Sequence, residues 1–319
     1  MDTAEVVCFG EVLVDFTPAG LSGAGMRLFE QNAGGAPANV AAALAKLGRR
    51  AAFAGKVGRD MHGDFLRRAL LQCGVDVANL AADPREPTSM AFVALSDEGE
   101  RGFSFMRGAD AKLPALSARA LRGVKVFHFG SLSMTSIAAR AATQKTVRLA
   151  RKAGCVISFD PNYRAMLWPS ERAAALCISS ALGQTDILKV SEEEALLLTG
   201  IGDAEGAGKA LLSRGPCCVC VTLGARGALL CRPGFCLHTP TYPGPVTDTT
   251  GAGDAFTAGF LRGLLARGLR PQNITEPLAR ELCAFAHAAA TLCVAKRGGI
   301  PAMPGLEDVT ALMRKENYP

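Results

Sequence analysis

Short apolar runs alternate with longer stretches of helical periodicity along most of the chain. The runs are four to seven residues long, which is typical of buried strands, and the stretches between them repeat apolar positions every three or four residues. Strands are predicted at residues 6–9, 51–54, 124–129, 155–159, 187–190 and 217–223, and helices at residues 36–47, 64–71, 137–152, 192–198 and in most of the chain from residue 252 onward. This alternation predicts an α/β fold with a mostly parallel central sheet and helices on both faces.

Two consecutive strand-like runs, residues 88–95 and 101–106, break this alternation because no helix lies between them. They predict an antiparallel hairpin, to which the turn-rich segment from residue 12 to residue 30 can add strands. The alternative to a separate small sheet is an antiparallel edge of the main sheet. We predict a single domain over residues 1–319, with a β-sheet lid formed from about residues 12–33 and 86–113.

Composition and charge exclude several classes of protein. Of the 319 residues, 49% are hydrophobic and 20% are charged, which excludes wholesale disorder. The net charge of +6 is scattered in pairs such as Arg49-Arg50, so we expect no nucleic-acid partner. The apolar run without a charged side chain at residues 282–295 is shorter than the ~20 residues that span a bilayer. With no export signal visible, we expect no membrane association and a cytoplasmic location.

The chain has eleven cysteines, many of them within apolar stretches such as residues 217–221. We expect reduced, buried thiols that pack as small hydrophobic side chains. A zinc site would need a second Cys-x2-Cys pair to complement Cys217 and Cys220, and the neighbouring segments contain none.

Residues 248–256 read Asp-Thr-Thr-Gly-Ala-Gly-Asp-Ala-Phe and precede a helical pattern. Small residues allow the backbone N–H groups of Gly251, Ala252 and Gly253 to turn toward one point, where the helix dipole adds positive potential. This pattern favours an anion hole for a phosphate under transfer, with Asp254 placed to accept a proton from a hydroxyl. The alternative is a glycine-rich helix start with Asp254 as an ordinary first-turn carboxylate.

A second glycine-rich segment opens the first long helix. Gly34 and Gly35 permit close approach of a ligand, and the Asn39 side chain offers both hydrogen-bond donors and acceptors. A ligand with several hydroxyls suits this combination. The alternative is a plain helix N-terminus, which explains Pro37 near the first helical position but not the paired glycines. The sequence contains neither a P-loop motif nor a Gly-x-Gly-x-x-Gly motif after the first strand.

Three motifs together resemble those of the ribokinase-like, or PfkB, carbohydrate kinases. They are Gly34-Gly35 with Asn39, residues 160–164 (Asp-Pro-Asn-Tyr-Arg) and residues 248–254. The resemblance covers essentially the whole chain, and residues 130–133, 160–164 and 189–194 are most similar to bacterial fructokinases. It implies a three-layer α/β domain with a β-sheet lid, and a sugar kinase that uses ATP and Mg²⁺.

The same resemblance implies roles for individual residues. Asp254 would be the base that deprotonates the sugar hydroxyl, and the amides of Gly251, Ala252 and Gly253 would hold the charge of the γ-phosphate. The sugar would contact a carboxylate, a glycine pair, an amide and two arginines: Asp15, Gly34, Gly35, Asn39, Arg107 and Arg164. The alternative to a sugar contact is that Asp15 is a surface residue in a turn and that both arginines are ordinary surface side chains.

The implied nucleotide site draws on several segments. Its residues are Lys189, Glu192, Thr222, Gly224, Gly227, Gly251, Gly253 and His287. Glu192 matches the acidic residue that orders Mg²⁺ waters in ribokinases, and Lys189 stands where their motif has asparagine, from where its charge can reach ATP phosphates. His287, one polar residue on an apolar helix, is alternatively a packing histidine. A monovalent cation, K⁺, would bind at Asp248, Thr250, Lys296, Gly298 and Ala302.

The leading hypothesis is therefore an ATP-dependent fructokinase that phosphorylates a primary hydroxyl of D-fructose. Other substrates for the same chemistry are 2-keto-3-deoxygluconate, a nucleoside or another sugar, because lid residues set specificity. The competing hypothesis is a non-catalytic sugar or nucleotide sensor on the same fold. Such a sensor is expected to have lost the catalytic base, whereas this sequence keeps it at Asp254. A homodimer through the lid is expected by analogy with the family.

Overall fold

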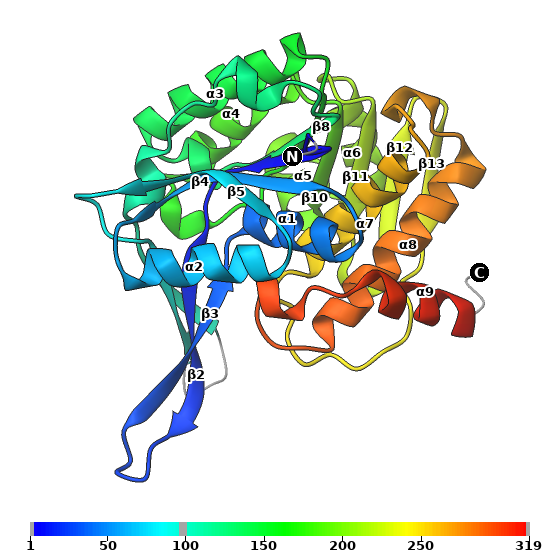
Figure 1. Ribbon diagram of the computed structural model, residues 1–319. Coiled ribbons are helices and arrows are strands. Elements are labelled where there is room, and N and C mark those ends of the chain that lie inside the picture. The colour runs from blue at the N-terminus through cyan, green and yellow to red at the C-terminus, as the bar shows by residue number, and fades with distance from the viewer. Residues whose placement is uncertain (1–2, 96–100, 317–319) are drawn as a thin grey trace.

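A long twisted sheet forms the middle layer of the computed structural model, which describes residues 3–95 and 101–316 (Figure 1). Within those residues the sheet has nine strands in the order β13-β12-β11-β10-β9-β8-β1-β4-β5. The strands are β1 (Val6–Phe9), β4 (Ala51–Gly58), β5 (Asp76–Asp83), β8 (Val126–Gly130), β9 (Val156–Asp160), β10 (Ile187–Ser191), β11 (Cys218–Thr222), β12 (Ala228–Arg232) and β13 (Phe235–Thr239). Only the pairs β11–β12 and β12–β13 are antiparallel among these strands, so the predicted mostly parallel sheet is confirmed.

Helices cover both faces of this sheet, each over its own apolar cluster (Figure 1). One face carries α1 (Ala36–Lys46), α2 (Met61–Gln72), α7 (Ala252–Ala266), α8 (Glu276–Val294) and α9 (Leu306–Lys315). The other carries α3 (Ile137–Lys152), α4 (Glu171–Leu182), α5 (Glu192–Thr199) and α6 (Ala204–Leu212). Strands buried on both faces read as continuous apolar runs, which is why the sequence pattern located them.

A second, smaller sheet is formed in the order β3-β2-β6-β7. Its strands are β2 (Leu13–Leu21), β3 (Arg27–Gly34), β6 (Met90–Leu95) and β7 (Arg101–Met106). The lid sheet is thus present, and β2 and β3 project away from the main sheet in Figure 1. The alternative of an antiparallel edge on the main sheet is wrong for residues 88–106, and the predicted turn at residues 96–100 lies outside the described residues.

Three strands of the main sheet were not predicted. Strand β5 forms one edge, and only Val77 and Leu80 of its eight residues are buried. Its Asp, Asn and Ala side chains have low strand propensity. Strands β12 and β13 form the other edge as a hairpin around Pro233-Gly234. In the described part of the chain, no helix is long and apolar enough to cross a bilayer.

Candidate active site

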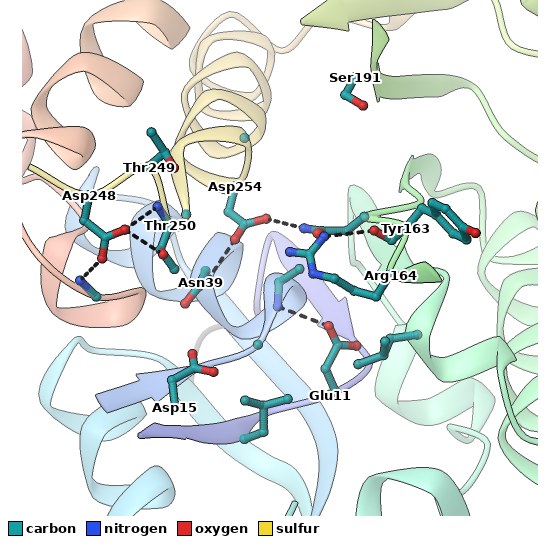
Figure 2. A pocket seen from close by; sticks show the side chains of 18 of the residues that line it. Glu11, Asp15, Asn39, Tyr163, Arg164, Ser191, Asp248, Thr249, Thr250 and Asp254 are labelled. Carbon is teal, nitrogen blue, oxygen red and sulfur yellow. Dashed lines mark hydrogen bonds between the residues drawn. The ribbon is translucent and has the colours of Figure 1, made fainter. Parts of the chain in front are cut away.

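A cavity of about 580 Å³ lies where the lid sheet meets the carboxyl ends of β9 and β10 (Figure 2). Ligands of parallel α/β folds bind at this edge of the sheet. The walls come from five stretches of chain and from three isolated residues, Phe105, Leu132 and Gly298. The lining residues include Glu11, Leu13, Asp15, Thr17, Gly35, Ala36, Asn39, Asn162, Tyr163, Arg164, Lys189, Ser191, Glu193, Glu194, Asp248, Thr249, Thr250, Gly251, Gly253, Asp254 and Gly298.

Asp254, on the first turn of α7, is 4% exposed and is held by two side-chain amides. Asn39 Nδ2 donates to Oδ2 at 2.8 Å, and Asn162 Nδ2 donates to Oδ1 at 3.1 Å (Figure 2). Burial and the nearby Asp160 carboxylate raise the pKa of Asp254 to about 7, against the lowering effects of Asn39 and Lys189. A fixed carboxylate with this pKa is suited to accept a proton near neutral pH.

The helix start beneath Asp254 requires glycine at two positions. Gly251 caps α7 with a φ of 80°, a left-handed conformation that other residues rarely adopt. A Cβ on Gly253 would lie 2.6 Å from Lys189 Nζ, so the missing side chain lets this ammonium approach the helix N-terminus. The first N–H groups of a helix have no acceptor within it. Gly251, Ala252 and Gly253 therefore form the beginning of α7 at the cavity, as the anion-hole prediction requires.

Lys189 is buried on β10 and forms an ion pair with Asp160, with Nζ 3.1 Å from Oδ2. Burial alone would lower the pKa of Lys189, but the carboxylates of Asp160, Glu194 and Asp254 outweigh it and raise that pKa. The ammonium therefore stays charged beside Gly253. This places a fixed cation at the N-terminus of α7, where the resemblance implied a contact with phosphate.

Asp15, on β2, faces the same cavity from the lid side (Figure 2). Burial and, to a smaller extent, the charge of Asp248 raise its pKa to about 7, although Arg164 opposes the shift. A Cβ on Gly34 would lie 2.0 Å from Asp15 Oδ2, so Gly34 provides the space for the carboxylate. Gly35, with a φ of 107°, packs against the backbone of Glu11 and begins α1. Asp15, Gly34, Gly35 and Asn39 are thus brought together as predicted.

The two arginines expected at the substrate lie in different places. Arg164 lines the cavity, where its charge acts on both Asp15 and Asp254. Arg107 is outside the lining residues because its guanidinium is paired with buried Asp110 at 2.6 Å and donates to Thr135 Oγ1 at 3.1 Å. Arg107 thus links the end of the lid to the segment after β8, and the substrate contact that the resemblance implied stays a prediction.

Glu192 also departs from its expected position. Its carboxylate pairs with Arg226 and lies outside the cavity lining, and its implied role toward Mg²⁺ waters stays a prediction. Glu193 and Glu194 line the cavity instead. Glu194 accepts the backbone N–H groups of Tyr163 at 2.6 Å and Ser191 at 2.8 Å, and thereby joins the segment after β9 to the start of α5.

The remaining nucleotide residues lie outside the cavity lining, namely Thr222, Gly224, Gly227 and His287. Thr222 ends β11, and the two glycines flank the turn before β12. His287 is 3% exposed, contacts Thr239 Oγ1 at 3.0 Å and packs edge-on against Phe256, and burial lowers its pKa to about 4. The packing alternative therefore describes His287, and an adenine contact at this ring is not supported.

Asp248 closes the loop before α7. Its Oδ1 accepts from Thr250 N at 3.0 Å and Thr250 Oγ1 at 2.8 Å, and its Oδ2 accepts from Gly298 N at 3.1 Å. The expected cation ligands Asp248, Thr250 and Gly298 are therefore adjacent and all line the cavity, while Lys296 and Ala302 do not. Among residues 3–95 and 101–316 there is no group of three or more His, Cys, Asp or Glu side chains arranged to hold a metal ion.

Asn162 and Glu11 are among the residues of the site that sequence reasoning missed. Asn162 has a φ of 47°, a left-handed conformation in which asparagine is enriched, and this turn aims its amide at Asp254. Glu11 is 4% exposed, and its Oε1 accepts from Ala36 N at 3.1 Å while Oε2 has no hydrogen-bond partner among the described residues. Burial raises the pKa of Glu11 to about 8. The left-handed conformation of Asn162 had no signal in the sequence other than the position of this residue in the Asp-Pro-Asn-Tyr-Arg motif at residues 160–164.

Comparison with known proteins agrees with this geometry. The family described as "pfkB family carbohydrate kinase" matches residues 3–305. The chain is 38% identical to a probable fructokinase-5 of Arabidopsis thaliana, over 99% of each chain. It also resembles the structure of a fructokinase with bound ATP from Xylella fastidiosa, with a TM-score of 0.91 and 33% identity over 98% of this chain and 99% of that one.

A fructokinase from Vibrio cholerae O395, solved with fructose, ADP and calcium, is similar as well, with a TM-score of 0.86 and 31% identity over 97% of this chain and 99% of that one. A double mutant of that enzyme was solved with fructose, ADP and potassium. With the family match over nearly the whole length and the three-layer fold with its lid, the chain belongs to the pfkB family of carbohydrate kinases.

Proposed function

We propose that this carbohydrate kinase is an ATP-dependent fructokinase that transfers the γ-phosphoryl group of ATP to a primary hydroxyl of D-fructose. The observation that carries the proposal is Asp254, a buried carboxylate with a pKa of about 7 at the N-terminus of α7. One side of its cavity carries hydroxyl-binding groups and the other carries a helix N-terminus and an ammonium. The similarity to fructokinases from plants and bacteria supports fructose as the acceptor.

In the proposed reaction, Asp254 accepts the proton of the sugar hydroxyl as its oxygen attacks the γ-phosphorus. The bond between that phosphorus and the oxygen bridging to ADP breaks, and ADP leaves with the electron pair. Asn39 and Asn162 fix both carboxylate oxygens, so the group is oriented before the sugar arrives. A proton bound at Asp254 then returns to solvent when the products leave.

Charge on the transferring phosphoryl group is stabilised by fixed groups of the chain. The N–H groups at the start of α7 and the Lys189 ammonium beside Gly253 present positive potential at one point. Mg²⁺ bound to the nucleotide would neutralise further phosphate charge. Because the described residues form no acidic cage, this ion fits as one carried mainly by the phosphates themselves.

The sugar end of the cavity is built around a carboxylate that can accept two hydroxyl hydrogen bonds. Asp15 supplies it, Gly34 leaves room for it, and Asn39 offers an amide close to Asp254. We propose that closing the lid over this end excludes water, which would otherwise compete with fructose for the phosphoryl group.

We also propose a monovalent cation, K⁺, at the Asp248 loop. The donor set fits a hard cation, because the Asp248 carboxylate and the Thr250 hydroxyl are both oxygen ligands. The ion would tie the loop before α7 to the segment around Gly298 and so stabilise the anion hole.

The direct test is ADP release with Mg-ATP and a panel of acceptors, with and without K⁺. The panel contains fructose, 2-keto-3-deoxygluconate, ribose, tagatose, glucose and inosine. Strong preference for fructose is the expected result. Preference for 2-keto-3-deoxygluconate would agree with an ion pair between Arg164 and the carboxylate of this substrate. The phosphoryl-transfer chemistry would then stand, and only the proposed substrate would change. No acceptor-dependent turnover would favour a non-catalytic sensor.

Two further properties are proposed from exposed and buried side chains. The lid strands β2 and β3 and their connection expose Leu21, Met26, Leu28 and Phe29, which suits contact with the lid of a second copy. Light scattering should then show a dimer, and the Phe29→Lys variant should shift the protein toward the monomer. All eleven cysteines are free, which agrees with the reducing cytoplasm as the location.

A further inference from the structure

The hairpin of β12 and β13, at one edge of the main sheet, places two cysteines opposite each other. Strands β12 and β13 lie side by side in Figure 1. They are joined by Pro233 and Gly234, and Cys231 is the register partner of Cys236. In a two-residue hairpin the residue pair that flanks the turn is a hydrogen-bonded pair, so the next pair along the strands is a non-hydrogen-bonded pair. Such pairs bring their Cα atoms to about 4.5 Å, within the range that a disulfide bridges.

The two sulfur atoms already face each other. The Cys236 thiol donates to Cys231 Sγ at 2.6 Å, closer than ordinary contact between two sulfur atoms. Cys231 is fully buried and Cys236 is half-buried. A Cβ on Gly208 of α6 would lie 2.7 Å from Cys231 Sγ, so the helix packs tightly behind that sulfur. Cys231 therefore has little room to turn away from its partner.

A cation lies beside the pair. The Lys209 ammonium on α6 interacts electrostatically with both thiols and forms an ion pair with Glu205 at 2.5 Å. Its charge lowers the pKa of the Cys231 thiol, but burial and the hydrogen bond with Cys236 outweigh this effect and raise that pKa, so Cys231 stays a thiol. Solvent reaches Cys236 but not Cys231, so the two residues differ in the way that an attacking and a resolving cysteine require.

We propose that Cys231 and Cys236 are a site of reversible oxidation, at which a small-molecule disulfide such as oxidised glutathione converts the two thiols into an intramolecular disulfide. The inference does not depend on the kinase activity, because it rests on the hairpin register and the packing of α6 alone.

The chemistry is thiol–disulfide exchange in two steps. The Cys236 thiolate attacks one sulfur of glutathione disulfide, forms a mixed disulfide and releases one glutathione thiolate. The Cys231 sulfur then attacks Cys236 Sγ, and its proton leaves with the second glutathione. Two cysteine thiols are oxidised, and one glutathione disulfide is reduced to two thiols.

The test uses the full chain and maps thiols by mass spectrometry. Arg232 precedes Pro233, so trypsin leaves both cysteines in one peptide, residues 227–262, which holds no other cysteine. After incubation with oxidised glutathione and alkylation, this peptide should lose two hydrogens and carry no alkyl group, and dithiothreitol should reverse both changes. Three variants complete the design: Cys231→Ser, Cys236→Ser and the matched control Cys73→Ser, which removes another half-buried thiol.

In Cys231→Ser, Cys236 should retain one glutathione because no resolving thiol remains. In Cys236→Ser, the buried Cys231 should stay a free thiol, and Cys73→Ser should oxidise like the parent chain. The proposal is overturned if the peptide of the parent chain remains fully alkylated, or if Cys236 keeps its glutathione with Cys231 present. The measurement on the parent chain decides the matter even if a variant fails to fold.

Discussion

Asn39 donates its side-chain amide to Asp254 Oδ2 at 2.8 Å, although 215 positions separate the two residues in the sequence. The contact joins the starts of two helices that both begin at glycines: Gly34 and Gly35 precede α1, and Gly251 and Gly253 stand at the start of α7. A hydrogen bond to the ionised form of a buried carboxylate favours that form. Asn39 thus keeps the pKa of Asp254 lower than burial alone would set it.

The Asn39→Ala variant should therefore need a higher pH for the same activity. Asp254 acts as a base only when deprotonated, so kcat/KM for fructose should fall as the pH drops through about 7. Loss of the Asn39 hydrogen bond raises the pKa of Asp254 further, which moves this acidic limb to higher pH. The measurement is kcat/KM against pH for both proteins.

Asp15 also has a pKa of about 7, so the fall of kcat/KM at low pH in the parent enzyme reports the titration of both Asp15 and Asp254. The difference between parent and variant isolates Asp254. The exposed Asn273 is a matched position for an asparagine-to-alanine control, and its limb should coincide with the parent's. An unshifted limb in Asn39→Ala would contradict the assignment of Asp254 as the titrating base.

Two glycine-to-alanine changes should separate the sugar end from the phosphate end. A Cβ at Gly34 would meet Asp15 Oδ2 at 2.0 Å, and one at Gly253 would meet Lys189 Nζ at 2.6 Å. We expect Gly34→Ala to raise the KM for fructose at least about tenfold, because the displaced carboxylate loses hydroxyl hydrogen bonds of about 1.5–3 kcal/mol. Gly253→Ala should lower kcat while fructose binding changes little. Steady-state kinetics with each substrate varied will distinguish the two, and the same parameter changing in both variants would argue against separate ends.

The sequence predicted much of this arrangement, and the misses have physical causes. Buried parallel strands such as β1 and β10 produce unbroken apolar runs, and the glycines before α1 and α7 mark places where a side chain would collide. The positions of Glu192 and Arg107 could not be predicted, since the Glu192 carboxylate pairs with the distant Arg226, and the Arg107 guanidinium is held by both the nearby Asp110 and the distant Thr135. Long-range pairing of charged side chains leaves no local pattern.

Lys189 is expected to serve both stability and phosphoryl transfer. Lys189→Met leaves the buried Asp160 carboxylate without its partner, which should lower the free energy of unfolding by about 3–5 kcal/mol. The double variant Asp160→Asn, Lys189→Met no longer leaves the Asp160 carboxylate unpaired and should regain part of that stability, although Glu194 and Asp254 still lose the nearby ammonium. Its kcat should nevertheless stay low, because the cation beside Gly253 is still missing. Urea unfolding and steady-state rates on the three proteins provide the test, and recovery of rate together with stability would assign Lys189 a structural role only.

Glu11 should make the chain less stable as the pH rises. Its pKa is about 8 in the folded protein against 4.5 as the usual value, so the folded state binds more protons between those values. Stability is then lost as the pH rises from 4.5 toward 8, because ionisation is easier in the unfolded chain. Glu11→Gln removes this penalty, which reaches up to about 3 kcal/mol at neutral pH.

Urea unfolding of parent and Glu11→Gln proteins at low and high pH measures this effect. The variant should gain stability relative to the parent as the pH increases, and the exposed Glu307→Gln control should not. A constant difference between the two proteins across the pH range would show that Glu11 ionises normally in the folded state.

The most direct test of the central claim is the Asp254→Asn variant, with turnover and fructose binding measured on the same preparation. Asparagine keeps the size of the side chain but cannot accept the hydroxyl proton, so kcat should fall by about 10²- to 10⁴-fold. Fructose affinity by calorimetry should stay close to that of the parent, because Asp15 and the lid remain intact. Turnover close to the parent's in the variant would contradict the role of Asp254 as the base, and with it the proposed mechanism.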